Sequence, residues 1–366
     1  MAKAKINLSI AKNHSTPIEV LEFLFKKDDS YINYDLAINP STPENILLKL
    51  AKSLDEDILY NLGMNLSIND NLIKKIIKYD GGKKGLSENP RSNIATLDNL
   101  AKDESHKIRN RVANNPSTKI ETLIQLSKDE SEWVRSGVAS NPNTPKEILI
   151  KLAAEKDEDR IRAYVSQNES TPTAALDLLI KDPEVSIREF TAKHPNLSVS
   201  LIIECTAKKG KEASLKEYSA LNPSLPTEII LTLSKDKNSN VRSAIAINPS
   251  TPREIINILS KDKDFDVRRG VASNLKITSE LLEQLSNDED DSVRWYLAMN
   301  KKITSEVLEI LSIDKSARVR QSVADNVNCS AKVLEKLAND KDESVRNYVA
   351  TNPNTPINVL KEFAGL

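Results

Sequence analysis

One phrase recurs along the chain at nearly constant spacing and limits what the chain can fold into. Ala-Ile-Asn-Pro-Ser-Thr-Pro stands at 37–43 and again at 246–252, and its asparagine can be followed through the sequence at intervals of 24 to 28 residues, mostly 26. The column positions are Asn13, Asn39, Asn65, Asn89, Asn115, Asn141, Asn168, His194, Asn222, Asn248, Asn274, Asn300, Asn326 and Asn352. This period predicts a single repeat solenoid over 1–366, with no stretch left for a separate catalytic domain.

Each repeat has the pattern of two helices. The asparagine is followed by Thr-Pro-x-Glu, as at 251–254. This motif predicts a helix with threonine as its N-cap and proline at its first position, where the glutamate bonds back to the N-cap as in a capping box. Ile255, Ile256 and Leu259 then follow at the spacing of one helical stripe. A shorter segment, such as 134–139, precedes the next Asn-Pro and is short enough to be α or 3₁₀. We expect an all-α solenoid of about fourteen two-helix repeats of about 26 residues.

The recurring columns resemble a known family. Val-Arg-x-x-Val-Ala-x-Asn-Pro-x-Thr-Pro-x-Glu-x-Leu-x-x-Leu resembles the leucine-rich-repeat variant family over essentially all of 1–366. This resemblance implies α-helices that alternate with 3₁₀ helices in a right-handed superhelix. The Asp…Val-Arg element is also similar to HEAT-like repeats. Some variant-repeat proteins add a cysteine cluster for iron and sulfur, but this chain has only Cys205 and Cys329, so no cluster is expected. Neither resemblance implies one particular activity.

Charge and composition exclude several classes of protein. The chain has 52 Lys+Arg against 53 Asp+Glu, so it is not a polycation of the kind that coats nucleic acid. Two cysteines are too few for a disulfide scaffold, and no apolar run approaches the ~18 residues of a membrane helix. The first residues lack the apolar core of a signal peptide. Gly-rich phosphate loops, His-Glu-x-x-His and Gly-x-Ser-x-Gly do not occur. We expect a cytoplasmic protein that is not an enzyme and holds no metal or cofactor.

The most regular polar columns are explained by the solenoid itself. Nine repeats carry an arginine six residues before the column position, and eight of these arginines have an aspartate six residues earlier. This pattern favours a ladder of Asp–Arg pairs over a phosphate-binding surface. The asparagine column is interpreted as a ladder that satisfies backbone groups, with His194 as a substituted rung. Cys205 falls in an apolar column, and Cys329 falls in the threonine column near a helix start.

Two variable columns directly after the arginine column hold many of the aromatic residues. A constant frame with changing aromatic side chains is typical of the binding surface of a repeat protein. We predict that a partner contacts Tyr164, Phe190, Tyr218, Trp295, Tyr296 and Tyr348. The alternative is that these rings pack between repeats, in which case they would be buried.

Two repeats, near 66–89 and 195–222, depart from the regular spacing and are rich in lysine. Their basic residues are predicted to lie in irregular loops that contact phosphates or acidic partners: Lys74, Lys75, Lys78, Lys83, Lys84, Lys208, Lys209 and Lys211. The alternative is a solvated lysine face, and Gly81-Gly82 could mark a flexible break in the superhelix.

Three functions are compatible with the pattern. The first is a non-catalytic scaffold that binds a protein or peptide along one face. The second is a nucleic-acid-binding HEAT-like solenoid, with DNA repair as one form of it, for which Trp133, Trp295, Arg111 and Arg269 are the candidate residues. The third is a self-assembling spacer, because the repeats reach both ends without a polar capping unit and would expose apolar surface there.

Overall fold

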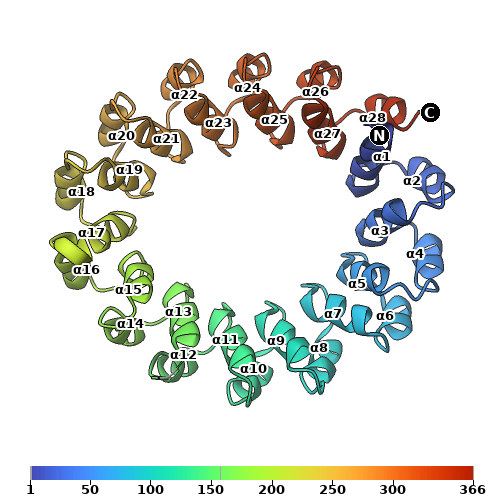
Figure 1. Ribbon diagram of the computed structural model, residues 1–366, viewed down its shortest axis with the longest axis horizontal. Coiled ribbons are helices and arrows are strands. Elements are labelled where there is room, and N and C mark those ends of the chain that lie inside the picture. The colour runs from blue at the N-terminus through green and yellow to red at the C-terminus, as the bar shows by residue number, and fades with distance from the viewer. Residues whose placement is uncertain (1, 157, 366) are drawn as a thin grey trace. The chain divides into compact units, whose positions relative to one another are not determined.

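The computed structural model describes residues 2–156 and 158–365, except the side chains of residues 2–5 and 211, and in these ranges it is α-helical without strands (Figure 1). Two compact units are distinguished: unit 1 comprises 1–143 and 329–366, and unit 2 comprises 144–328. Each is built from helix pairs that follow the sequence period. The all-α repeat fold expected from the sequence is therefore confirmed.

Among its described residues, unit 1 contains fourteen helices. Their bounds are α1 Ala2–Lys12, α2 Ile18–Phe25, α3 Ser30–Ile38, α4 Glu44–Leu50, α5 Glu56–Met64, α6 Asp70–Ile76, α7 Asp80–Glu88, α8 Ile94–Leu100, α9 His106–Asn114, α10 Ile120–Leu126, α11 Glu132–Ser140, α26 Ala331–Leu337, α27 Glu343–Thr351 and α28 Ile357–Ala364.

Unit 2 contains fourteen α-helices and one short 3₁₀ helix among its described residues. Their bounds are α12 Lys146–Ala153, α13 Asp159–Gln167, α14 Thr173–Leu179, α15 Val185–Ala192, α16 Val199–Thr206, η1 Gly210–Glu212, α17 Ala213–Ala220, α18 Thr227–Leu233, α19 Ser239–Ile247, α20 Arg253–Leu259, α21 Phe265–Ser273, α22 Ser279–Ser286, α23 Asp291–Ala298, α24 Ser305–Leu311 and α25 Ala317–Asp325.

Each unit has two layers of helices. Odd-numbered helices contact one another, as α19 with α21 and α21 with α23, and within each unit they line the concave side of the stack (Figure 1). Even-numbered helices form the other layer. The apolar stripes meet between the layers: Ile256 of α20 and Val267 of α21 are nearly or fully buried. Burial of these facing stripes holds successive repeats together, because a helix pair alone cannot cover its own stripe.

The helices of the odd layer are α-helices and not 3₁₀ helices, which settles the alternative left open by the sequence. Most have nine residues, longer than a 3₁₀ segment normally persists. Among the described residues, 3₁₀ geometry is assigned only to Gly210–Glu212, in the longest repeat.

The threonine of Thr-Pro-x-Glu does not cap the helix that follows, so that prediction was wrong for these repeats. Proline stands at the N-cap of α20, and the Thr251 hydroxyl donates instead to the carbonyl oxygen of Ile245, 2.6 Å away at the end of the preceding helix. In the repeat of Asn274 the position of the proline is held by Thr278, which caps α22 by accepting a hydrogen bond from the Leu281 N–H. Thr118, which is followed by lysine, still donates to the carbonyl oxygen of Val112 in the preceding helix.

The glycine-rich segment of the short repeat is a helix and not a flexible break. On α7, Gly85 lies so close to α5 that an added Cβ would stand 2.1 Å from the carbonyl oxygen of Tyr60. A Cβ on Gly81 would similarly stand 2.1 Å from the carbonyl oxygen of Glu56. The glycines therefore serve a close approach of two helices, which only residues without a side chain permit.

The first and last repeats of the chain contact each other within unit 1. Helix α1 packs against α27 and α28, and the Asn13 amide donates to the carbonyl oxygens of Ala350 at 2.9 Å and Asn352 at 3.0 Å. Ile10 and Leu360 are fully buried, so the apolar surface expected at the two ends is covered by contacts within the chain. Self-association stays a prediction.

Candidate functional site

The asparagine column forms a ladder of buried side chains. The Asn248 amide donates to the carbonyl oxygens of Ala220 at 2.7 Å and Asn222 at 2.8 Å, and its Oδ1 accepts from the Ser250 N–H at 2.8 Å. Asn39 and Asn89 make the equivalent bonds to the repeat before them. Each such rung satisfies backbone groups that the turn leaves without helical partners, so this column is structural.

His194 takes the asparagine position by imitating its hydrogen bonds. Its Nε2 lies 2.8 Å from the carbonyl oxygen of Asn168, and its Nδ1 accepts from the Asn196 N–H at 3.1 Å. Burial lowers the pKa of His194, which favours the neutral ring that can both donate and accept. The interpretation of His194 as a substituted rung agrees with these contacts.

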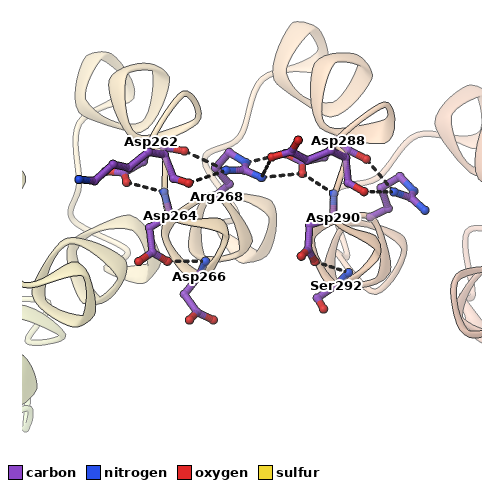
Figure 2. A network of polar contacts seen from close by, with 10 residues as sticks. Asp262, Asp264, Asp266, Arg268, Asp288, Asp290 and Ser292 are labelled. Atoms are coloured by element: carbon purple, nitrogen blue, oxygen red, sulfur yellow. Dashed lines mark hydrogen bonds and ion pairs between the residues drawn. The ribbon is translucent and has the colours of Figure 1, made fainter.

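The arginine column also forms a ladder, and Figure 2 shows two of its rungs. Arg268 donates from Nε and NH2 to the Asp288 carboxylate at 2.7 and 2.9 Å, while NH1 donates to the carbonyl oxygen of Asp262 at 3.0 Å (Figure 2). In the rungs of Arg109, Arg242, Arg268 and Arg294, the arginine binds the aspartate side chain of the following repeat and only the backbone of the aspartate six residues before it. The hydrogen bond from Arg242 holds the pKa of the Asp262 carboxyl below its usual range.

Lysine replaces arginine at two rungs. Lys83 Nζ lies 2.7 Å from Asp103, and Lys216 Nζ lies 3.1 Å from Asp236. A lysine gives one contact where arginine gives a two-point contact, so these rungs are held less rigidly.

The aromatic columns are only partly covered by neighbouring repeats. Tyr164 is 42% exposed and Tyr348 41% exposed, whereas the rings of Phe190, Tyr218, Trp295 and Tyr296 have intermediate exposure. None of these six side chains is buried, which is the accessibility that a contact surface requires. Their role in binding a partner stays a prediction.

Three of these rings occupy the same position on three successive helices of the odd layer: Tyr164 on α13, Phe190 on α15 and Tyr218 on α17. The Lys193 ammonium lies 4.8 Å from the centre of the Phe190 ring and 6.0 Å from that of Tyr218. Burial raises the pKa of Tyr218, and the charges of Glu189 and Glu217 raise it further. We call Tyr164, Phe190 and Tyr218 the aromatic stripe.

A second aromatic group lies on α23. The rings of Trp295 and Tyr296 meet edge to face with centres 4.6 Å apart. Arg318 stacks on Trp295 at 3.4 Å, and Arg269 lies 5.1 Å from the Tyr296 ring centre. Each guanidinium therefore covers part of a ring that would otherwise face solvent.

The sequence did not single out Lys193 and Arg318 as members of these groups. Lys193 directly precedes its column position, and Arg318 stands eight residues before its own. Positions eight, five, four and one before the column share one helix face, so the helical period could have identified them.

Arg111 and Arg269, the arginines proposed for the nucleic-acid alternative, both have acidic partners. Arg111 Nε lies 2.5 Å from Glu88, and Arg269 NH2 lies 2.9 Å from Asp266. Trp133 is 49% exposed and borders a cavity of about 330 Å³ together with His106, Lys107, Asn110 and Arg111.

Glu88, the partner of Arg111, also accepts a hydrogen bond from the Tyr60 hydroxyl at 2.6 Å. Burial of Tyr60, together with this hydrogen bond to Glu88, raises the pKa of Tyr60 to about 12.

The predicted basic loops are mostly not loops. Lys74 and Lys75 lie on α6, and Lys83 and Lys84 lie on α7, where Lys84 Nζ is 2.5 Å from Asp80. Lys78 stands in the turn between these helices, with its ammonium 5.0 Å from the Tyr79 ring centre. Lys208 and Lys209 lie in the turn before η1, and the side chain of Lys211 is outside the described residues. The prediction of irregular loops therefore holds for Lys78 and for the segment after α16, and it is wrong for the lysines on α6 and α7.

Three buried titratable groups lie outside these surfaces. Burial raises the pKa of Asp35 to about 6, although Lys12 Nζ stands 3.6 Å from its carboxylate. Cys205 and Cys329 are buried, as the apolar interpretation of Cys205 requires, and burial raises the pKa of the Cys329 thiol to about 12. A thiol with such a pKa is protonated at neutral pH and is a weak nucleophile.

Within the described ranges, no group of three or more His, Cys, Asp and Glu side chains is arranged to hold a metal ion. In the same ranges, no helix has both the length and the apolar character needed to cross a membrane.

Comparisons with known proteins give matches among solved structures only. No family model matches the chain, and no curated protein matches it. Among solved structures, it is similar to a leucine-rich repeat variant with a novel repetitive structural motif, at 20% identity and a TM-score of 0.33, over 68% of this chain and 87% of that one. It is also similar to the crystal structure of an engineered protein, at 14% identity and a TM-score of 0.22, over 98% of this chain and 94% of that one.

Proposed function

We propose that the protein is a non-catalytic scaffold that binds an extended peptide segment along the aromatic stripe of unit 2. The observation that carries the proposal is the placement of Tyr164, Phe190 and Tyr218 at one position of three successive helices, with none of the rings buried. Tyrosine and phenylalanine supply large contact areas at little entropic cost, which suits them as anchors for a partner.

The spacing of the stripe supports an extended peptide as the partner. Packed helices lie ~8–10 Å apart, and an extended chain advances ~3.3 Å per residue. About every third side chain of such a peptide would therefore meet the next ring. Glu189 and Glu217 act on the Tyr218 hydroxyl, so they supply negative charge beside the stripe. The preferred peptide would carry apolar residues at about every third position and a basic residue facing these glutamates.

The nucleic-acid alternative has less support. In the regular rungs the guanidinium N–H groups already donate to aspartate and backbone oxygens, as those of Arg242 and Arg294 do. Few donors are then left for a phosphate.

The test is selection of random linear peptides on the full-length protein, followed by affinity measurement on the selected peptides. Tyr164→Ala with Tyr218→Ala should weaken binding by roughly 30-fold or more, as loss of interface anchors does. Leu178→Ala with Ile203→Ala is the matched control, because these exposed side chains belong to α14 and α16 of the other layer.

Equal loss in both variants, or no selected peptide, would contradict the proposal. Binding of random-sequence DNA or RNA with a steep salt dependence would instead favour the nucleic-acid alternative.

A further inference from the structure

One rung of the arginine ladder in unit 2 lacks its carboxylate. From Asn89 to Asn326, the residue fourteen positions after the column position is acidic in every repeat but one, and in the repeat of His194 it is Lys208. Helix α16 begins five residues after His194, just as α22 begins five residues after Asn274. Lys208 is therefore the equivalent of Asp288, and the additional residues of this repeat follow it.

Arg188 is held like the other arginines of the ladder. Its NH1 donates to the carbonyl oxygens of Asp182 at 2.6 Å and Pro183 at 2.9 Å, as NH1 of Arg268 does to Asp262 and Lys263. These bonds fix the plane of the guanidinium. The edge formed by Nε and NH2 then faces the following repeat, where the other arginines find an aspartate.

At Arg188 this edge has no equivalent acceptor. Nε is buried, and among the described residues no acceptor lies within hydrogen-bond distance of it. NH2 is 3.8 Å from Glu212 Oε1, which is longer than a hydrogen bond. A buried guanidinium N–H without a protein partner is costly, and such groups call for an acceptor from water, an ion or a ligand.

A cavity of about 280 Å³ lies beside this edge. Arg188 and Lys208 line it, and its apolar wall consists of Ile180, Leu201, Cys205 and Leu215. Three of these wall residues are at most 8% exposed. The cavity therefore combines an unsatisfied cationic edge and other charged side chains with one apolar wall, a mixed lining that suits a small ligand with a charged and an apolar end.

The acidic residues that also line the cavity do not replace the missing aspartate. Asp182 is bound by Arg162 at 2.7 and 3.4 Å. Glu204 and Glu212 both stand 3.4 Å from Lys208 Nζ, and their side chains are 62% and 42% exposed. Both glutamates therefore reach the cavity from its solvent side, and neither fills the buried position beside Nε.

We propose that this cavity binds a small carboxylate with a short apolar body, whose carboxylate takes the place of the missing aspartate side chain. The guanidinium edge matches a carboxylate in two-point geometry, and Lys208 adds a second positive charge. The apolar body lies against Cys205 and Leu215. A volume of about 280 Å³ admits fewer than about ten non-hydrogen atoms.

The test uses benzoate and inorganic phosphate as probes, at constant ionic strength, on the full-length protein. The Arg188 Nε–H resonance in a ¹H–¹⁵N spectrum is the readout, and that of Arg268, whose rung is complete, is the internal control. Millimolar benzoate is expected to shift the Arg188 signal and leave the Arg268 signal in place. Phosphate is expected to act at least about tenfold more weakly, because it gains nothing from the apolar wall.

The decisive variant is Lys208→Asp, which restores the acidic residue of the regular rung. It should abolish the benzoate response and raise the melting temperature, since the new carboxylate satisfies Arg188 from within the chain. Glu212→Gln should tighten benzoate binding, because it removes a negative charge that competes for Arg188.

Three results would each overturn the proposal. They are no shift of the Arg188 signal with benzoate, an equal response to benzoate and phosphate, and a benzoate response that persists in Lys208→Asp. Arg188→Lys tests the two-point geometry separately. Benzoate is expected to raise the melting temperature of the unaltered protein, and this variant, which keeps the charge, should lose that rise. Retention of that rise would also count against the proposal.

Discussion

The stretch α19–α23 and the stretch α15–α17 belong to the same unit and obey the same repeat, yet they differ at their polar rungs. The first has Asn248, Asn274 and complete Arg–Asp pairs. The second has His194 for asparagine, Lys208 for aspartate and Lys216 for arginine.

The apolar layers of the two stretches are nearly identical in burial. Ile187, Ile202 and Leu215 of the irregular stretch are at most 2% exposed, as are Val267, Leu282 and Val293 of the regular one. The helices are therefore set by burial of the apolar stripe, and the polar rungs add stability and fix the register. A rung can change without loss of the fold, which leaves individual rungs free to acquire other roles.

The largest effect is expected from removal of a regular asparagine rung. Asn248→Ala removes three hydrogen bonds: it leaves the Ala220 carbonyl and the Ser250 N–H without this partner, and the Asn222 carbonyl with only the Leu225 N–H. At about 1 kcal/mol or more for each group, the free energy of unfolding should fall by about 3–4 kcal/mol. Guanidinium denaturation measures the loss. A change below about 1 kcal/mol would show that the ladder contributes little beyond the apolar layers.

The next effect is expected from a regular charged rung. Asp288→Ala leaves the guanidinium of Arg268, whose side chain is only 10% exposed, without its carboxylate. Loss of one partner of a buried pair should destabilise the protein by about 3 kcal/mol. Glu289→Ala is the matched control, because that side chain is 88% exposed and its contact to Arg268 should contribute less than about 1 kcal/mol. Equal effects of the two variants would contradict the assignment of the ladder.

A smaller effect of opposite sign is expected at His194. His194→Asn should restore the second carbonyl contact of the rung and raise the free energy of unfolding by about 1 kcal/mol at neutral pH. The difference should grow in acid, because burial lowers the folded-state pKa of His194 below its ordinary 6.5. The unfolded chain then binds the extra proton first, so the unaltered protein loses stability as the pH falls below about 6.5.

Denaturation midpoints of both proteins across this pH range measure the effect. A difference between them that does not change with pH would mean that the pKa of His194 is the same in the folded and unfolded states.

The smallest effect is expected at Lys216. Lys216→Arg should replace one contact to Asp236 with a two-point contact and raise the free energy of unfolding by about 0.5–1 kcal/mol. The melting temperature measures it, and Lys235→Arg, next to Asp236 in sequence, is the control for a general effect of arginine. A gain of the same size in the control would remove the ladder as the explanation.

The sequence predicted most of the fold because each position of the repeat occurs many times, so the residue type that the position requires can be seen in one sequence. The asparagine column, the two-helix unit and the substituted rung at His194 all agree with the structure. The aromatic columns were also recognised, although the stacked cations Lys193 and Arg318 were overlooked. The residue type at these two helix positions varies from repeat to repeat. The contacts also join a cation of one repeat to a ring of a neighbouring repeat, at a different position of the helix face.

Other features needed the fold. Threonine capping was predicted from local motif chemistry, yet proline takes the N-cap and the Thr251 hydroxyl donates to the preceding helix. The glycines of α7 suggested flexibility, since the sequence cannot show how closely α5 approaches them.

By itself, the sequence determined the period, the helical layers and the columns of asparagine, arginine and aspartate, because apolar spacing and repetition are local properties of a chain. Only the tertiary structure decided which aspartate each arginine binds, since Asp262 and Asp288 are both available to Arg268 and stacking brings the later carboxylate to its Nε. The same stacking leaves the Nε of Arg188 facing a cavity, because a missing partner in the next repeat can be seen only when the two repeats lie side by side.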